Sequence, residues 1–170
     1  MTFSQIPPAS FTLVGTGDFR ADGNTALVFQ NRVDSGVVFW YTGGANRAVI
    51  TGGDRVGRAV DAGWTLVGVA DFNKDGRSDL LFQNQTTGQL VIWYMNGATY
   101  VGGGQSSATA GPDWKVVGVG DYNGDGYADL LFQNQTTNRS SVWYMNGTLY
   151  RGGSGLSVSL PADWQIVGLR

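Results

Sequence analysis

The chain has 170 residues, of which 14% are charged and 42% are hydrophobic, and its formal net charge is −2. This length is sufficient for one domain with a hydrophobic core. There is no positive field to attract a nucleic-acid backbone, and no apolar run approaches the ~20 residues that a membrane helix needs. We therefore expect no nucleic-acid partner and no membrane insertion.

Several catalytic residue types are absent. The sequence has no Cys, no His and no Glu, so every acidic residue is Asp. This excludes cysteine nucleophiles, Ser-His-Asp triads, His-ligated zinc and disulfides. A pair of Asp residues could still support glycosidase chemistry, but the acids outside the repeated pattern are only Asp34, Asp54 and Asp61, in loop-like contexts. We therefore expect a protein that is not an enzyme.

Three repeat units follow one another along the chain. The first begins FTLVGTGDFRADG at Phe11, the second WTLVGVADFNKDG at Trp64 and the third WKVVGVGDYNGDG at Trp114. A fourth unit begins as WQIVGLR at Trp164, and these three tryptophans are 50 residues apart. Repeats at such a period predict one structural unit each. The predicted units are residues 11–63, 64–113, 114–163 and a partial unit at 164–170.

Each unit is predicted to contain four strands in chain order. In the second unit the first strand begins at Trp64, and the others are DLLFQN at 79–84, LVIWYM at 90–95 and a short TYVGG at 99–103. Asn96-Gly97 and Asn146-Gly147 are strong hairpin-turn signals, and no helical period is present. Four antiparallel strands per unit predict an all-β fold of β-propeller blades, about three per chain plus one extra strand. A β-trefoil or β-prism is the alternative.

An acidic loop joins the first two strands of the second and third units. Loop positions are counted from Asp71 and Asp121, which are position 1. Oxygen-bearing residues occupy positions 1, 3, 5 and 9, Gly occupies position 6, and position 7 would offer a backbone carbonyl. This is the donor set that Ca²⁺ prefers. The alternative is an Asx-rich turn without metal. The predicted calcium ligands are Asp71, Asn73, Asp75, Arg77, Asp79, Asp121, Asn123, Asp125, Tyr127 and Asp129.

The loop of the first unit departs from this pattern. Position 3 is Arg20 and position 9 is Ala26, so two oxygen donors are lost. We expect a metal-free loop in which the Arg20 guanidinium replaces the cation by pairing with Asp18 and Asp22. The alternative is an Arg20 side chain that is simply solvated. Two calcium ions per chain are thus predicted.

The pattern D-x-N-x-D-G-x-x-D-L-L followed by a strand resembles the FG-GAP, or VCBS-type, repeat. The match is close over 71–84 and 121–134 and partial over 18–31. Such repeats occur in integrin-α-like propellers, bacterial extracellular proteins and integrin-like lectins. The resemblance implies calcium that supports the architecture rather than catalysis, and it implies a secreted or cell-surface location. It does not fix the function, because the family includes adhesion and sugar-binding proteins and modules attached to enzymes.

Antiparallel order places the acidic loops at one end of each unit and aromatic and amide groups at the other. Aromatic faces beside amides and carboxylates suit sugar recognition. The alternative is that the tryptophans pack between units and the QNQTT loops are only turns. The predicted glycan-binding residues are Trp64, Gln83, Asn84, Asp113, Trp114, Gln133, Asn134, Asp163 and Trp164.

The sequence thus favours a calcium-stabilised, multivalent carbohydrate-binding propeller. The alternative is a non-catalytic protein-interaction or adhesion module, or a propeller fragment of a larger extracellular protein. Because propellers typically use four to eight blades, three blades cannot close a ring. We therefore expect a closed homo-oligomer, most simply a dimer.

Overall fold

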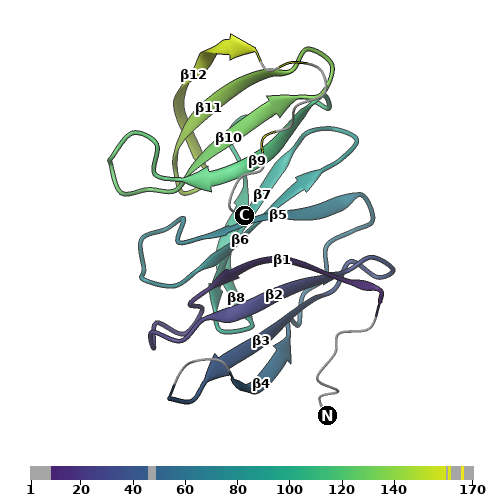
Figure 1. Ribbon diagram of the computed structural model, residues 1–170, viewed down its shortest axis with the longest axis vertical. Coiled ribbons are helices and arrows are strands. Elements are labelled where there is room, and N and C mark those ends of the chain that lie inside the picture. The colour runs from purple at the N-terminus through teal and green to yellow at the C-terminus, as the bar shows by residue number, and fades with distance from the viewer. Residues whose placement is uncertain (1–8, 46–48, 160, 162–165, 167–170) are drawn as a thin grey trace.

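The computed structural model describes residues 9–45, 49–159, 161 and 166 (Figure 1). All regular structure within this part of the chain is β, in three separate four-stranded antiparallel sheets. This confirms the predicted all-β fold of four-stranded blades. Blade 1 consists of β1 (Phe11–Gly17), β2 (Ala26–Asn31), β3 (Val37–Gly43) and β4 (Val49–Arg55).

Blades 2 and 3 repeat the same order of strands. Blade 2 consists of β5 (Trp64–Ala70), β6 (Asp79–Asn84), β7 (Leu90–Asn96) and β8 (Thr99–Gln105). Blade 3 consists of β9 (Trp114–Gly120), β10 (Asp129–Asn134), β11 (Arg139–Asn146) and β12 (Leu149–Ser159). The fourth strands are longer than the short segments predicted, because the glycine-rich continuation keeps pairing with the third strand.

The blades are stacked in chain order, with blade 2 between the other two (Figure 1). The first strands β1, β5 and β9 are neighbours in this stack. Glycine permits the close approach: a Cβ on Gly68 would lie 2.6 Å from Cγ2 of Val119 in the next blade, and one on Gly17 would lie 2.9 Å from Cγ1 of Val69. The described blades form an open array and not a closed ring.

The hydrophobic cores lie between successive blades. One cluster joins blades 1 and 2 and contains Phe19, Phe39 and Phe82; the other joins blades 2 and 3 and contains Phe72 and Phe132. Burial between neighbouring units, rather than around a shared three-fold axis, distinguishes this packing from the β-trefoil and β-prism alternatives. Stability is therefore concentrated at the junctions between blades.

A buried glutamine on the second strand of each blade links it to the next blade. Gln30 donates to the Trp64 carbonyl (3.3 Å) and accepts from the Leu66 amide (2.8 Å). Gln83 donates to the Trp114 carbonyl (2.7 Å) and accepts from the Val116 amide (3.1 Å). We call each such pair of bonds a glutamine bridge.

The glutamine of blade 3 makes a bond of the same kind. Gln133 accepts a hydrogen bond from the Ile166 amide at 3.2 Å. Ile166 belongs to the segment 164–170 that was predicted as an extra strand; the remainder of that segment lies outside the described residues.

Candidate functional site

The two acidic loops have the same backbone conformation. Positions 4 and 6 are left-handed in both, at Lys74 and Gly76 (φ 62° and 83°) and at Gly124 and Gly126 (φ 78° and 82°). Asp71 accepts hydrogen bonds from the Asp75 amide (3.1 Å) and the Gly76 amide (2.8 Å). The carboxylate at position 1 therefore closes the turn by binding backbone amides, as an Asx turn does.

The Asp at position 9 has a different role, because its side chain is fully buried. Asp79 accepts from the amides of Phe72 and Met95, both at 2.9 Å, and so joins the loop to β7. Asp129 accepts from Tyr122 (3.0 Å) and Met145 (2.9 Å) in the same way. Burial raises the pKa of Asp79 to about 7, against the lowering effect of the two amides, and it also raises the pKa of Asp129. A desolvated carboxylate here is stabilised by any nearby positive charge.

Calcium fits the residue types of these loops, with Asp and Asn oxygens at positions 1, 3, 5 and 9 and the carbonyls of Arg77 and Tyr127 available. The carboxylates are not gathered, however: within the described residues, no three or more acidic groups lie close enough to hold a metal. Asp75 accepts instead from the Arg77 amide (2.8 Å). The donors present therefore suit calcium, but the loops as they stand are held by backbone amides.

Lys74 links the two acidic loops. Its Nζ donates to the Asp125 carbonyl at 2.6 Å and lies 3.7 Å from the centre of the Tyr127 ring. A cation from blade 2 thus already contacts the loop of blade 3. The sequence does not predict this contact, because it depends on the distance between blades.

In blade 1 the prediction for Arg20 is wrong. Its guanidinium pairs with Asp54 of β4 at 3.2 Å and lies 3.4 Å from the centre of the Tyr41 ring, whereas only its backbone amide binds Asp18. The ring face and the Asp54 carboxylate attract the side chain along the blade, away from the loop. The loop keeps its shape because Asp18 accepts from the Gly23 amide at 2.7 Å.

Four of the predicted glycan ligands at the opposite end, two glutamines and two asparagines, use their side chains to bind backbone groups of the fold. Gln83 and Gln133 are buried and bind the backbone, so neither presents its amide to solvent as we had expected. Asn84 and Asn134 accept from the two threonine amides that follow in their turns. Asp113 is exposed, and its carbonyl accepts from the Gln135 amide. Asp163 and Trp164 lie outside the described residues.

The two described tryptophans of this set are half-buried and line clefts. Trp64 lines a cleft of about 500 Å³ between blades 1 and 2, together with Asn31, Arg32 and Gln85. Trp114 lines a separate cleft of about 490 Å³ with Arg139 and Ser141 of β11. We call the first of these the Trp64 cleft. Asn31, Arg32 and Gln85 were missed, although their position at or just after the ends of the second strands could have indicated them.

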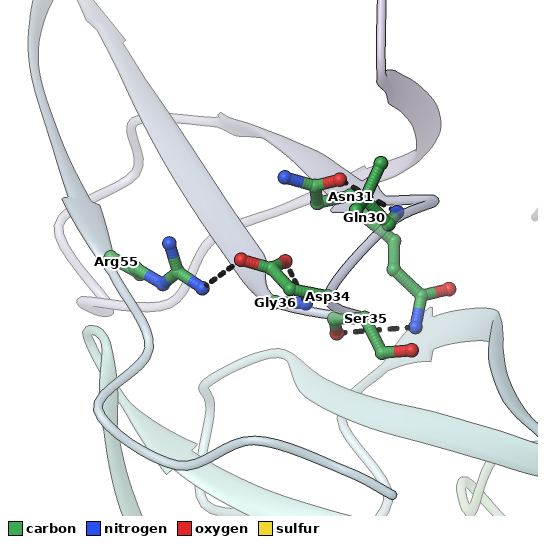
Figure 2. A network of polar contacts seen from close by, with 7 residues as sticks. Gln30, Asn31, Asp34, Ser35, Gly36 and Arg55 are labelled. Atoms are coloured by element: carbon green, nitrogen blue, oxygen red, sulfur yellow. Dashed lines mark hydrogen bonds and ion pairs between the residues drawn. The ribbon is translucent and has the colours of Figure 1, made fainter. Parts of the chain in front are cut away.

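Figure 2 shows a network of polar contacts in blade 1, and three of its residues, Gln30, Asn31 and Ser35, also line the blade 1 wall of the Trp64 cleft. The turn between β2 and β3 is held by Asp34, which accepts from the Gly36 amide (2.9 Å) and pairs with Arg55 of β4 (2.7 Å). The Arg55 side chain, followed by the Gly36 amide, lowers the pKa of Asp34. Gln30 Nε2 also contacts the Ser35 carbonyl (3.4 Å). The wall is therefore ordered by its own polar contacts.

One family model matches the part of the chain that contains these two loops. The FG-GAP-like repeat model matches residues 71–132, and no curated protein matches the chain. FG-GAP repeats are generally non-catalytic and occur in extracellular and surface proteins. In the part of the chain that the structure describes, no helix is long and apolar enough to cross a membrane. Together with the blade-like sheets, the match shows a β-propeller-type module that carries FG-GAP-like repeat sequence from the acidic loop of blade 2 into β10 of blade 3.

Proposed function

We propose that this chain is a calcium-stabilised carbohydrate-binding module, a lectin or a glycan-recognition unit, and not an enzyme. The Trp64 cleft is the observation that carries the proposal. Its volume of about 500 Å³ lies within the range of small-molecule sites, which is roughly 300–1,000 Å³. The blade architecture and the FG-GAP match support an interaction module, and the cleft supports a glycan as its ligand.

The lining of the cleft has the chemistry of a sugar site. The half-buried Trp64 offers an aromatic face, against which the C–H groups of a pyranose pack. Asn31 Oδ1 accepts from the Val33 amide and Gln85 Nε2 donates to the Gln83 carbonyl. The Asn31 Nδ2 donor and the Gln85 Oε1 acceptor are the groups that these two amides would offer to sugar hydroxyls. The separate cleft at Trp114 provides a second aromatic site one blade further on. Two weak sites on one molecule gain affinity for a multivalent glycan.

Calcium is proposed to bind the acidic loops of blades 2 and 3. Each loop holds several carboxylates in a short segment, one of them buried, and mutual repulsion is relieved when a cation is bound. Residues of the Trp64 cleft lie at the opposite ends of the strands, so calcium would support the fold without contacting the sugar. Binding to the folded state stabilises it by mass action. The corresponding location is secreted or cell-surface.

A glycan array probed with and without a chelator tests the proposal. We expect binding to particular glycans, reduced by Trp64→Ala and by Gln85→Ala, which removes an exposed amide from the cleft. Gln105→Ala is the matched control, because Gln105 is also exposed but lies on β8 outside the cleft. An array that stays blank at high density would reject the glycan proposal and favour a protein partner.

We further propose that copies of the chain associate, most simply as a dimer that closes a propeller. Leu13 of β1 is 53% exposed, whereas the equivalent Leu66 and Val116 are 1% and 3% exposed because a preceding blade covers them. The outer face of blade 1 is therefore apolar at a position that a neighbouring blade would bury. An exposed apolar face of this kind favours association with another copy.

A further inference from the structure

A larger cleft lies between blades 1 and 2 on the side of the acidic loops. Its volume is about 930 Å³, and its walls are the end of β4 with the linker that follows and the turn between β7 and β8. Three arginines line it, namely Arg20, Arg55 and Arg58, with Asp54 among them. On a chain of net charge −2, this is a local concentration of positive charge. We call it the arginine cleft.

The three guanidinium groups differ in how they are held. Arg55 is bound to Asp34 at 2.7 Å, and Arg20 is bound to Asp54 at 3.2 Å through two half-exposed side chains. Within the described residues Arg58 has no carboxylate partner; its guanidinium lies over the rings of Tyr100 (4.4 Å) and Trp93 (5.1 Å). A guanidinium that stacks on aromatic faces keeps its N–H edge for an oxyanion.

The next junction shows why the arginine cleft is open. Between blades 2 and 3, Ser107 donates from its amide to the Thr148 carbonyl (2.9 Å), and its hydroxyl accepts from the Tyr150 amide (2.8 Å). In the first junction Gly57 occupies the position of Ser107 and has no hydroxyl to offer. A Cβ on Gly57 would meet nothing within 4 Å, so the space beside it is empty.

The residue after Gly57 completes the difference between the junctions. Arg58 occupies the position that Ala108 has in the following repeat, and Arg20 occupies that of Asn73. The cations of this cleft are therefore specific to the first junction and are not a property of the repeat. On the opposite wall, the polar residues Asn96 and Thr99 line the same cleft.

We propose that the arginine cleft binds the oxyanion of an acidic saccharide, with Arg58 as its main contact and Arg20 as a second contact released from Asp54. Charge-assisted bonds from guanidinium to carboxylate or sulfate are among the stronger hydrogen bonds in proteins. Asn96 and Thr99 supply donors and acceptors for the neighbouring sugar hydroxyls. This goes beyond the proposed function, because it uses a different cleft and requires neither Trp64 nor calcium.

Calorimetric titration of the full chain tests this proposal with three probes: an oligogalacturonate, a sulfated but uncarboxylated galactan oligosaccharide and a neutral galactose oligomer. We expect binding of at least one acidic probe. Binding of only one probe identifies the oxyanion, and binding of both shows that the cleft accepts carboxylate and sulfate alike. Arg58→Gln should weaken binding by about tenfold. Arg151→Gln makes the same charge change on the exposed strand β12 and should leave binding within about twofold of the unmodified chain, since only long-range charge effects remain.

Two further variants test the geometry in opposite directions. Asp54→Asn frees Arg20 and should tighten binding severalfold, whereas Asp61→Asn, the same charge change in the exposed linker, should not. Gly57→Ser should weaken binding, because it supplies the hydroxyl that joins the walls in the next junction. It also carries the test if Arg58→Gln does not fold.

Equal binding of neutral and acidic probes, equal effects of Arg58→Gln and Arg151→Gln, or no binding of either acidic probe would overturn the proposal. Loss of acidic-probe binding in Trp64→Ala but not in Arg58→Gln would also overturn it, because the probe would then occupy the Trp64 cleft.

Discussion

Buried polar side chains on the second strands connect the parts of this molecule. Gln83 and Asp79 are both fully buried at opposite ends of β6, and each binds two backbone groups. A buried polar group is tolerated when all its partners are present, and removal of one side chain leaves the others unsatisfied. These two polar residues therefore hold strands and blades in place from inside the fold, although Gln and Asp are usually exposed.

Gln83→Ala is predicted to destabilise the protein by about 2 kcal/mol or more, because it leaves the Trp114 carbonyl and the Val116 amide without partners, at roughly 1–3 kcal/mol for each buried group. Chemical denaturation measures the change. Gln105→Ala, at an exposed position, is the control and should change stability by less than about 0.5 kcal/mol. Equal effects of the two substitutions would show that the glutamine bridge contributes little.

Blade 1 illustrates how one residue can be replaced within the repeat. Ala26 stands where blades 2 and 3 have the buried Asp. There the third strand is joined to the loop by Thr42, whose amide and hydroxyl both donate to the Thr25 carbonyl (2.9 and 2.6 Å). A threonine and a backbone carbonyl thus perform the joining role of the carboxylate, without bringing a negative charge into the loop.

At the scale of strands and loops, the sequence predicts those strands and turns that are determined by residues close together in the chain. The repeated segment DLLFQN indicated β6, the aromatic and β-branched run LVIWYM indicated β7, and Asn96-Gly97 indicated the turn between β7 and β8. The length of β8 was underestimated, because glycine has low strand propensity and only its pairing with β7 makes it extended. The partner of Arg20 was missed because Asp54 lies 34 residues away. Gln83 was interpreted as a surface ligand because glutamine is usually exposed.

The first strands carry a prediction about the close contact between blades. Gly68→Ala should destabilise the protein by about 1–3 kcal/mol, because the new methyl group would overlap Val119 of blade 3 and force the blades apart. Thermal unfolding measures the loss. Gly104→Ala on β8 is the matched control, because a Cβ there has open space. A neutral Gly68→Ala would mean that the junction accommodates a methyl group.

The acidic loops carry a prediction about metal. Two calcium ions should bind per chain, and chelation should lower the melting temperature. Asp75→Ala should reduce the number of ions to one, as counted by calorimetry or metal analysis. Asp22→Ala, at the same loop position in blade 1, should leave the number at two because that loop lacks the donor set. Three bound ions, or no thermal response to chelator, would contradict the assignment.

At the scale of the whole molecule, the open stack exposes one apolar blade face. Light scattering of the purified chain should show a closed oligomer, most simply a dimer, and Leu13→Asp should convert it to monomer by placing a charge in the interface. Val33→Asp is the control, because Val33 is 84% exposed in the turn between β2 and β3 and should not affect assembly. A stable monomer at high concentration would contradict the proposed association.

The glutamine bridge has a consequence for how such a chain can change over evolutionary time. Each bridge joins one side chain to a backbone carbonyl and a backbone amide, and almost every residue type has both groups. The receiving strand can therefore mutate at those two positions without losing the bond, provided that no proline removes the amide. After duplication, deletion or transplantation of a blade, each remaining glutamine could still bond to the backbone of the blade that follows it. The bond between blades thus requires a glutamine on one strand but no particular side chain on the strand that receives it. The number of blades can therefore vary while the surface of each blade diverges.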